Sequence, residues 1–499
     1  MIRKFTVCVY TNALLVIILS LYLFVAPILL LAQDLSESAL SSGDVPRFAF
    51  RWHRALSIDI ENWARQRVAS GKAATLSVQD ISGTEWPVFS SVFYLWATES
   101  LQDAWEKDQT LSAGMPKEYA RGAIEAAAAL VGDPGHAAWV KKYWGDAYLT
   151  REDLFYRMLL ISGLTSYQKL SGNDQYRRLL SEQVDSLSTE LDASPYGLLD
   201  DYPGQCYPID ILPAIAAIRR ADAVLGTDHA AFVARALRAF EDTRLDPSTG
   251  LPAYIADSKT GLGSGPARGV GIAYMLIWTP ELWPETSRQW YGAYQEHFWQ
   301  QNRAIAGVRE FSQNASLPFA EWSLSDVDAG PVVAGYGTAA SAFGIGAARA
   351  NGHLDQAYAL SAEALMVSWP LPDGTLFMPR MLSNRSDAPY VGETILLFDL
   401  TRRPVVENIV AGQNQVPLVV YFGMAFYLVM GGIFAGSGVD AILRWEKLKS
   451  TVVIPGLTQM FWARLILMIV GIGLAMLIHP LIGLLPLVLS QLFPRSQRN

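Results

Sequence analysis

The chain has 499 residues, of which 51% are hydrophobic and 17% are charged, and its formal net charge is −8. An acidic chain without a basic stripe is not expected to bind nucleic acid. The six histidines are scattered without metal-ligand spacing, and no phosphate-binding or dinucleotide-binding fingerprint occurs. We therefore predict no metal ion and no cofactor.

The N-terminal end is apolar. Ala13 to Ala32 is an uncharged run long enough to span a bilayer, and Arg3 and Lys4 precede it. The positive-inside rule then places the N-terminus in the cytosol, and we predict a transmembrane anchor over residues 1–33. An uncleaved or cleaved signal peptide is the alternative. Both interpretations export the following residues, which predicts a plasma-membrane or inner-membrane protein with a periplasmic main domain.

The C-terminal end is apolar as well. We predict a transmembrane helix over 416–437, a basic cytosolic loop over 438–460, and a further transmembrane helix over 461–493. The Lys and Arg residues of the loop favour the cytosolic side, and this agrees with an exported middle. Pro480 and Pro486 are candidate kinks in the last helix. The lipid bilayer is thus an expected partner, and the oligomeric state stays unknown.

Residues 34–410 form the expected exported domain, in which Cys206 has no cysteine partner for a disulfide. Helical periodicity dominates this region and strand patterns are sparse. Helices are predicted over Arg51–Ala69, Val88–Glu106, Lys117–Val131, Gly135–Tyr143, Glu152–Leu170, Asp174–Glu190, Ile209–Leu225, Asp228–Phe240, Gly269–Trp278, Glu285–Asn302, Val333–Asn351 and Leu354–Val367.

Fully apolar helices alternate with amphipathic ones. Val333 to Phe343 carries no charge, whereas Asp174 to Glu190 is charged on one side. A helix that is apolar all round is buried, so the alternation favours an inner ring of helices wrapped by an outer ring. We predict an all-α fold, an (α/α)6 toroid flanked by transmembrane helices. An irregular helical bundle is the alternative.

Five loops rich in Gly, Pro, acidic and aromatic residues recur at a spacing of roughly 60 residues, which is two helices with their connections. Each is expected to lead into the N-terminus of an inner helix, where free N–H groups and the helix dipole favour carboxylates and polar ligands. These loops should therefore line one funnel. They are Gly83–Pro87, Tyr148–Asp153, Asp200–Pro208, Gly263–Gly269 and Asp326–Pro331.

Two of these loops suggest an acid/base pair. Glu85 stands beside Trp86, and an apolar neighbour raises the pKa of a carboxyl group towards that of a general acid. Asp201 or Asp328 is the expected base. Pro87 at a first helical turn offers a purely structural interpretation of the first loop.

The third loop has the densest cluster of functional side chains. Asp210 is a further catalytic candidate there, although a carboxylate near a helix N-terminus is also explained by the dipole. Cys206 is more often a small buried apolar residue than a nucleophile. The candidate substrate-binding residues are Trp86, Tyr156, Tyr202, Cys206, Tyr207, Arg268 and Glu310.

The succession of helical hairpins with acid-bearing loops resembles the six-hairpin α/α-toroid glycosidases, which implies a carboxylic acid and a carboxylate base on opposite sides of a funnel. The stretch Tyr202–Tyr207 and its following helix also resemble the linalool dehydratase/isomerase-type toroid domain. That family builds its site from Asp, Tyr, His and Cys, and uses a cysteine pair where this chain has one exported cysteine. The likeness covers Arg51 to Val367.

Three functions follow as hypotheses. The first is a membrane-anchored extracytoplasmic carbohydrate-active enzyme that acts on a cell-envelope or exported glycan, with Glu85 as proton donor. The second is a hydro-lyase or isomerase that acts on a small alcohol through Tyr202, Cys206 and Asp210. The third is a non-catalytic glycan-binding or scaffold subunit of an envelope machine.

Overall fold

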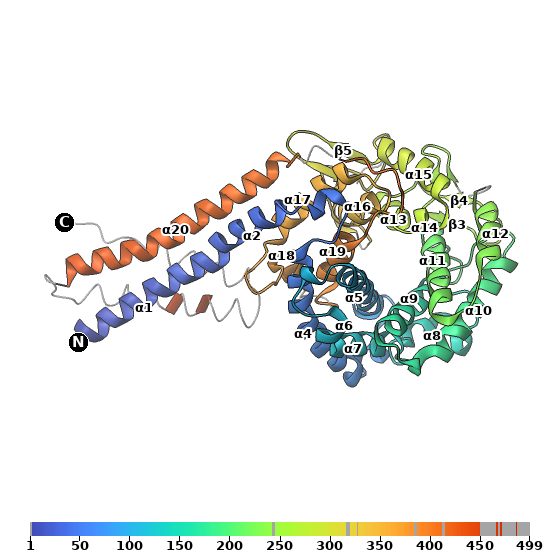
Figure 1. The fold of residues 1–499 in the computed structure, drawn as a ribbon, viewed down its shortest axis with the longest axis horizontal. Helices are drawn as coiled ribbons and strands as arrows, with labels where there is room; N and C mark the ends of the chain where they lie inside the picture. Colours follow the sequence, from blue (N-terminus) through green and yellow to red (C-terminus); the bar gives the residue numbers. More distant parts are fainter. Residues whose placement is uncertain are drawn as a thin grey trace. The chain divides into compact units, whose positions relative to one another are not determined.

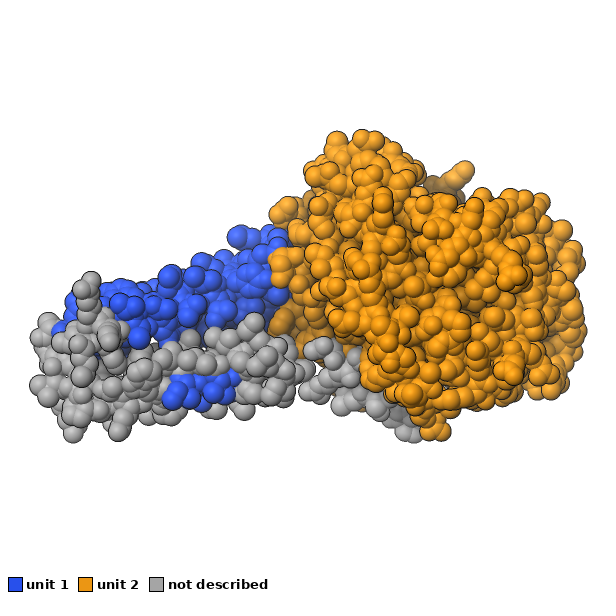
Figure 2. Space-filling view, turned by 90° about the horizontal axis from the view of Figure 1, so that it is seen from below, with its two compact units in different colours: residues 1–32, 369–372, 421–499 blue, residues 33–368, 373–420 orange. Residues whose placement is uncertain are grey.

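The computed structural model describes residues 2–241, 245–315, 320–326, 328–383, 387–411 and 415–449, with a few isolated residues between 466 and 486. The prediction of a mainly helical chain is confirmed. The predicted transmembrane helix over 461–493 and the second half of the predicted basic loop lie outside the described residues. The chain divides into two compact units, coloured separately in Figure 2.

Unit 1 contains residues 1–32, 369–372 and 421–499. It holds most of α1 (Ile2–Ser20), a π-helical turn (Leu21–Val25), α2 (Ala26–Leu35) and α20 (Leu418–Leu448). The helical stretches Thr6–Leu35 and Leu418–Leu448 are long and apolar enough to cross a bilayer. Because α20 continues to Leu448, the first part of the predicted basic loop is helical instead.

Small residues let the two long helices of unit 1 approach closely. The Ser20 hydroxyl donates to the Gly431 carbonyl at 2.7 Å, and Phe24 stacks on Phe434 with ring centroids 5.5 Å apart. A Cβ atom on Gly438 would lie 2.9 Å from the backbone oxygen of Ala13. In a bilayer the hydrophobic effect does not drive helices together, so apolar helices associate through close packing at small residues and through hydrogen bonds of this kind.

Unit 2 contains residues 33–368 and 373–420. Six helices of unit 2 form a closed cycle, because each contacts the next along the chain and the last contacts the first. Figure 1 shows these inner helices side by side. They are α5 (Ile81–Lys107), α9 (Leu154–Ser171), α11 (Pro208–Leu225), α13 (Gly269–Leu276), α16 (Thr338–Ala350) and α19 (Val391–Thr401).

A second set of helices packs against this cycle: α4 against α5, α7 between α5 and α9, α10 between α9 and α11, α15 against α13 and α17 against α16, while α12 packs on α10. They are α4 (Arg47–Ser70), α7 (Arg121–Val131), α10 (Arg177–Ala193), α12 (Ala230–Glu241), α15 (Pro284–His297) and α17 (Leu354–Ser368). The short helices are α3 (Ala39–Ser42), α6 (Pro116–Tyr119), α8 (Ala138–Trp144), α14 (Thr279–Leu282) and α18 (Phe377–Ser383).

Short antiparallel strands connect several helices. The pairs are β1 (Leu245–Asp246) with β2 (Leu251–Pro252), β3 (Ile255–Ala256) with β4 (Gly263–Ser264), and β5 (Trp299–Gln301) with β6 (Ala306–Val308). A three-stranded sheet has the order β7 (Trp322–Asp326), β8 (Gly330–Val333) and β9 (Tyr336–Gly337). The helices predicted over Glu285–Asn302 and Val333–Asn351 are therefore too long, because strands occupy the end of the first and the start of the second.

The first predicted loop, Gly83–Pro87, is wrong, because these residues are helical. Asp80 caps α5 by accepting a hydrogen bond from the Gly83 N–H at 3.1 Å, so the helix begins at Ile81. Pro87 then lies inside the helix and cannot donate to the Gly83 carbonyl. The guanidinium of the buried Arg67 donates to that carbonyl instead. Arg67 thereby allows a proline two turns into α5.

Candidate functional site

A cavity of about 780 Å³ lies in unit 2 where the inner helices begin. Each of the six inner helices contributes lining residues from its N-terminal half, among them Glu85, Phe155, Asp210, Val270, Phe343 and Ile395. The structure thus brings together the four predicted catalytic carboxylates, since Glu85, Asp201, Asp210 and Asp328 all line this cavity.

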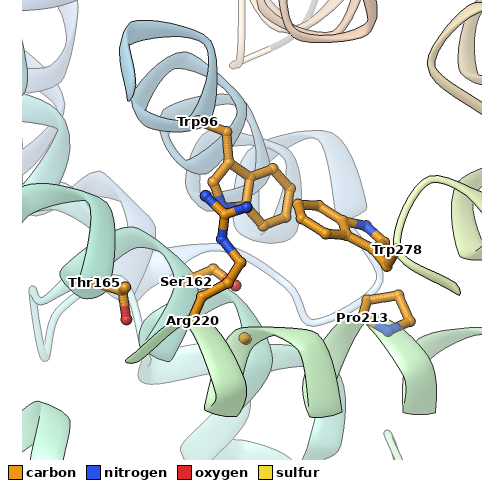
Figure 3. Close-up of a pocket in the computed structure, with 7 residues that line it drawn as sticks. Trp96, Ser162, Thr165, Pro213, Arg220 and Trp278 are labelled. Carbon is orange, nitrogen blue, oxygen red and sulfur yellow. The ribbon is translucent and has the colours of Figure 1, made fainter. Parts of the chain in front are cut away.

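Aromatic side chains fill the interior further along the same helices. Phe93 and Trp96 lie one and two turns beyond Phe89, which lines the cavity. Trp96 lies 4.7 Å from Trp278 and 5.2 Å from Phe398, measured between ring centroids. Figure 3 shows Trp96, Trp278 and the Arg220 side chain converging, and the space among them has no room for a water molecule. We therefore describe the cavity as closed at this end.

Glu85 lies in the second turn of α5 and faces the third loop. Burial raises the pKa of Glu85 to about 7. A hydrogen bond with the Tyr202 side chain lowers this pKa and the negative charge of Asp328 raises it. A carboxyl group with a pKa near neutrality can both donate and accept a proton at physiological pH.

Asp201 lies in the loop before α11, and Asp210 lies in the first turn of that helix. Burial, followed by the negative charges of Asp328 and Glu85, raises the pKa of Asp210 to about 8. Burial also raises the pKa of Asp201 well above its ordinary value, followed by the charge of Asp210. Asp201 has a positioning role besides, because its Oδ2 accepts a hydrogen bond from the Tyr207 N–H at 2.8 Å.

Asp328 lies in the turn between β7 and β8, and its side chain is 54% exposed. It accepts a hydrogen bond from the Tyr254 hydroxyl, and its Oδ2 lies 3.6 Å from Arg268 Nη1. The same guanidinium donates from Nε to Glu310 Oε1 at 2.6 Å. Arg268 therefore connects the buried Glu310 to the carboxylate at the cavity.

Several predicted substrate-binding residues line the cavity and others do not. Trp86, Tyr202 and Tyr207 line it. Tyr156 is buried against Trp139, at 6.0 Å between ring centroids. Cys206 is buried, and its carbonyl accepts a hydrogen bond from the Ala256 N–H at 2.9 Å. Four predicted residues are not among the described residues that line the cavity: Tyr156, Cys206, Arg268 and Glu310. Arg268 contacts both Glu310 and the cavity residue Asp328.

Sequence reasoning missed three residues of the site. Asp153 is buried at the start of α9, with the unusual φ of 47°, and its charge raises the pKa of Asp201. It ends the predicted loop Tyr148–Asp153. Tyr254 reaches the site from the β3 hairpin, and Tyr274 from the second turn of α13. For Tyr254 the only sequence feature that could have indicated a role in the site is its position before a Gly-rich loop.

The carboxyl groups at the cavity influence one another through their charges. The described part of the chain contains no group of three His, Cys, Asp or Glu side chains that could hold one. The charges that act on Glu85 and Asp210 are those of other carboxylates. No protein-family model matches this chain, and a comparison with curated proteins finds no match.

Proposed function

We propose that this protein is a membrane-anchored, extracytoplasmic carbohydrate-active enzyme of the (α/α)6 toroid class, which cleaves or rearranges a glycan by general acid/base catalysis. The closed cycle of inner helices and the helices that pack outside it support the toroid. The two long apolar helices support the anchor, and the positive-inside rule supports an exported unit 2.

The observation that carries the proposal is the environment of Glu85. Its raised pKa leaves a large protonated fraction at neutral pH, and it lines a cavity with three further carboxylates. Glu85 is therefore the proton donor to the glycosidic oxygen. General acid catalysis of this kind contributes about 10²–10⁴-fold to a rate.

Asp328 is the better candidate for the base. Asp201 is buried and its pKa is raised, so it holds its proton where a base must be ionised. Asp328 is half-exposed, so its carboxylate is accessible to water and substrate, and its Oδ2 lies 3.6 Å from Arg268 Nη1. In the proposed reaction Glu85 protonates the leaving oxygen while Asp328 attacks the anomeric carbon or takes a proton from the attacking water. Trp86 and Tyr207 offer faces on which a sugar ring stacks.

The hydro-lyase or isomerase remains a second candidate because part of the cavity is apolar. Phe89, Tyr274 and Phe343 form a contiguous aromatic surface, with Tyr274 and Phe343 5.4 Å apart. Such a surface suits a small hydrophobic alcohol. However, Cys206 does not line the cavity, so this reaction would depend on Tyr202 and Asp210 alone. A non-catalytic glycan-binding subunit would be favoured if the carboxylates were neutralised by arginines, as Glu310 is.

The experiment is an assay of the detergent-solubilised full chain against a panel of glycans that also contains small tertiary alcohols. Glu85→Gln and Asp328→Asn should each lower kcat/KM by about 10²-fold or more. Glu125→Gln is the matched control, because Glu125 is exposed on α7. Turnover of glycans at equal rates by all four proteins would overturn the assigned roles. Turnover of an alcohol alone would favour the second candidate.

A further inference from the structure

The cavity combines acidic and aromatic side chains in a way that indicates the charge of its ligand. We propose that it selects a substrate that carries a protonated amine, such as a saccharide containing a free amino sugar. The saccharide part of this inference rests on the proposed function. The preference for a cation rests on the cavity itself.

Carboxyl groups gather in the cavity wall, and burial together with their proximity to one another favours their protonated forms. Glu85, Asp201, Asp210 and Asp328 line it, and the buried Asp153 lies close enough to act on Glu85 and Asp201. The guanidinium of Arg268 is shared between Asp328 and Glu310, so it offsets a part of their negative charge. A phosphate or uronate group would add another negative charge to the set, whereas an ammonium group would relieve the repulsion.

One carboxylate oxygen in the wall is left for a ligand. Asp201 is 1% exposed, and its Oδ2 accepts the Tyr207 N–H. Its Oδ1 is buried and accepts no hydrogen bond of good geometry within the described part of the chain, although the Phe155 backbone lies near enough to lower the pKa of Asp201. A buried acceptor without a well-placed donor destabilises the folded state. An N–H donor of a bound ligand would satisfy this oxygen.

Aromatic faces in the wall suit a cation as well. Trp86, Tyr202, Tyr207 and Tyr254 line the cavity beside the carboxylates. The Arg268 guanidinium already lies 4.7 Å from the centroid of the Tyr254 ring. The electron-rich face of an aromatic ring attracts an ammonium group, more strongly when water is excluded. Carboxylates and ring faces together distinguish an amine from a neutral acetamide.

A cationic ligand should also release protons when it binds. At pH 6 the Glu85 and Asp210 carboxyl groups are largely protonated, because their pKa values are raised to about 7 and about 8. An ammonium group beside them favours the ionised forms, so protons leave the protein on binding. A neutral saccharide gives no such release.

The test is calorimetric titration of the full chain at pH 6 with three disaccharides, of glucosamine, N-acetylglucosamine and glucuronate, in two buffers of different ionisation enthalpy. Glucosamine disaccharide should bind at least tenfold more tightly than the other two, with net proton release. Asp210→Asn should lower both its affinity and the proton release, and Glu125→Gln should change neither. Equal or tighter binding of the acetylated or uronate disaccharide would overturn the proposal.

This result is separable from the proposed function. Binding of the amine without cleavage of any glycan would refute the enzymatic role and leave the selection of a cation standing. Cleavage of neutral glycans by wild type, with no preference for the amine in the titration, would refute the selection alone.

Discussion

Glu85 and Tyr202 share a hydrogen bond across the cavity, between the second turn of α5 and the loop before α11. This contact favours the ionised form of Glu85, while burial favours the protonated form more strongly. The two opposing effects leave the pKa of Glu85 near neutrality. The loop that carries Tyr202 therefore adjusts the acid that α5 supplies.

Replacing Tyr202 with Phe should move the pH dependence of catalysis. Loss of the hydrogen bond removes an effect that lowers the pKa of Glu85, so this pKa should rise above about 7. A general acid must be protonated, and the alkaline limb of kcat/KM should therefore shift to higher pH, by about one unit or less. The pH–rate profile of the free enzyme measures it. A shift to lower pH would contradict the role of Glu85 as the acid.

The buried Asp210 should make the protein less stable as pH rises. Its folded-state pKa, about 8, lies above the ordinary value near 3.8, so the folded state holds a proton that the unfolded state loses between about pH 4 and pH 8. Stability should fall across this window. Asp210→Asn should remove that part of the slope and be more stable than wild type at pH 8, with the difference closing towards pH 4. Denaturant midpoints of wild type and Asp210→Asn, measured between pH 4 and pH 8, test this prediction. A stability difference between the two proteins that grows towards acidic pH would refute it.

The hydrogen bond from Arg67 to the Gly83 carbonyl should contribute more to the unfolding free energy because Pro87 has no N–H to bond this carbonyl. Arg67→Met leaves this carbonyl without its donor, and unfolding free energy should fall by about 1–3 kcal/mol. Adding Pro87→Ala restores an N–H one turn along α5, so the double variant should recover part of the loss. The comparison of single and double variants by thermal unfolding measures the coupling. Strictly additive losses would show that the two residues act independently.

Gly269 at the start of α13 lies so close to the backbone of Arg309 that a larger residue does not fit there. A Cβ atom at Gly269 would lie 1.9 Å from the backbone oxygen of Arg309, next to Glu310. Gly269→Ala should therefore lower the unfolding free energy by about 1–3 kcal/mol. Gly292 in α15 is the control, because a Cβ atom there meets nothing within 4 Å. Gly292→Ala should be neutral or stabilise by about 1 kcal/mol, since alanine favours helix more than glycine does.

Sequence patterns predicted most helices because their periodicity is local. They did not predict α19, which completes the cycle of inner helices. Its apolar run of four residues, Ile395 to Phe398, is too short to tell a buried helix from a strand by periodicity alone. The start of α5 was missed for a related reason. Pro87 normally marks the first turn of a helix, and the partner that lets it lie deeper, Arg67, is on another helix.

The sequence predicts where the site lies along the chain better than it predicts which side chains contact one another there. The four predicted catalytic carboxylates precede or begin predicted helices, and the cavity lies where the inner helices start. They are Glu85, Asp201, Asp210 and Asp328. Loop membership does not specify which way a side chain points. Tyr156 and Phe155 are neighbours in sequence, yet only Phe155 lines the cavity in the described structure. The partner of Arg268 lies 42 residues away, beyond any local pattern.

The orientation of the chain in the membrane is testable with cysteines. Unit 2 should lie outside the cytosol, and the C-terminal end of α20 should lie in it, because Arg444 and Lys447 follow the positive-inside rule. In a Cys8→Ser background, where Cys206 is buried, Ala231→Cys places a thiol on the exposed face of α12, and Arg444→Cys places one near the end of α20. An impermeant maleimide should label position 231 in cells whose inner membrane is intact. It should label position 444 only after that membrane is permeabilised. Labelling of position 444 first, or of both together, would mean that the orientation is reversed or that α20 does not cross the bilayer.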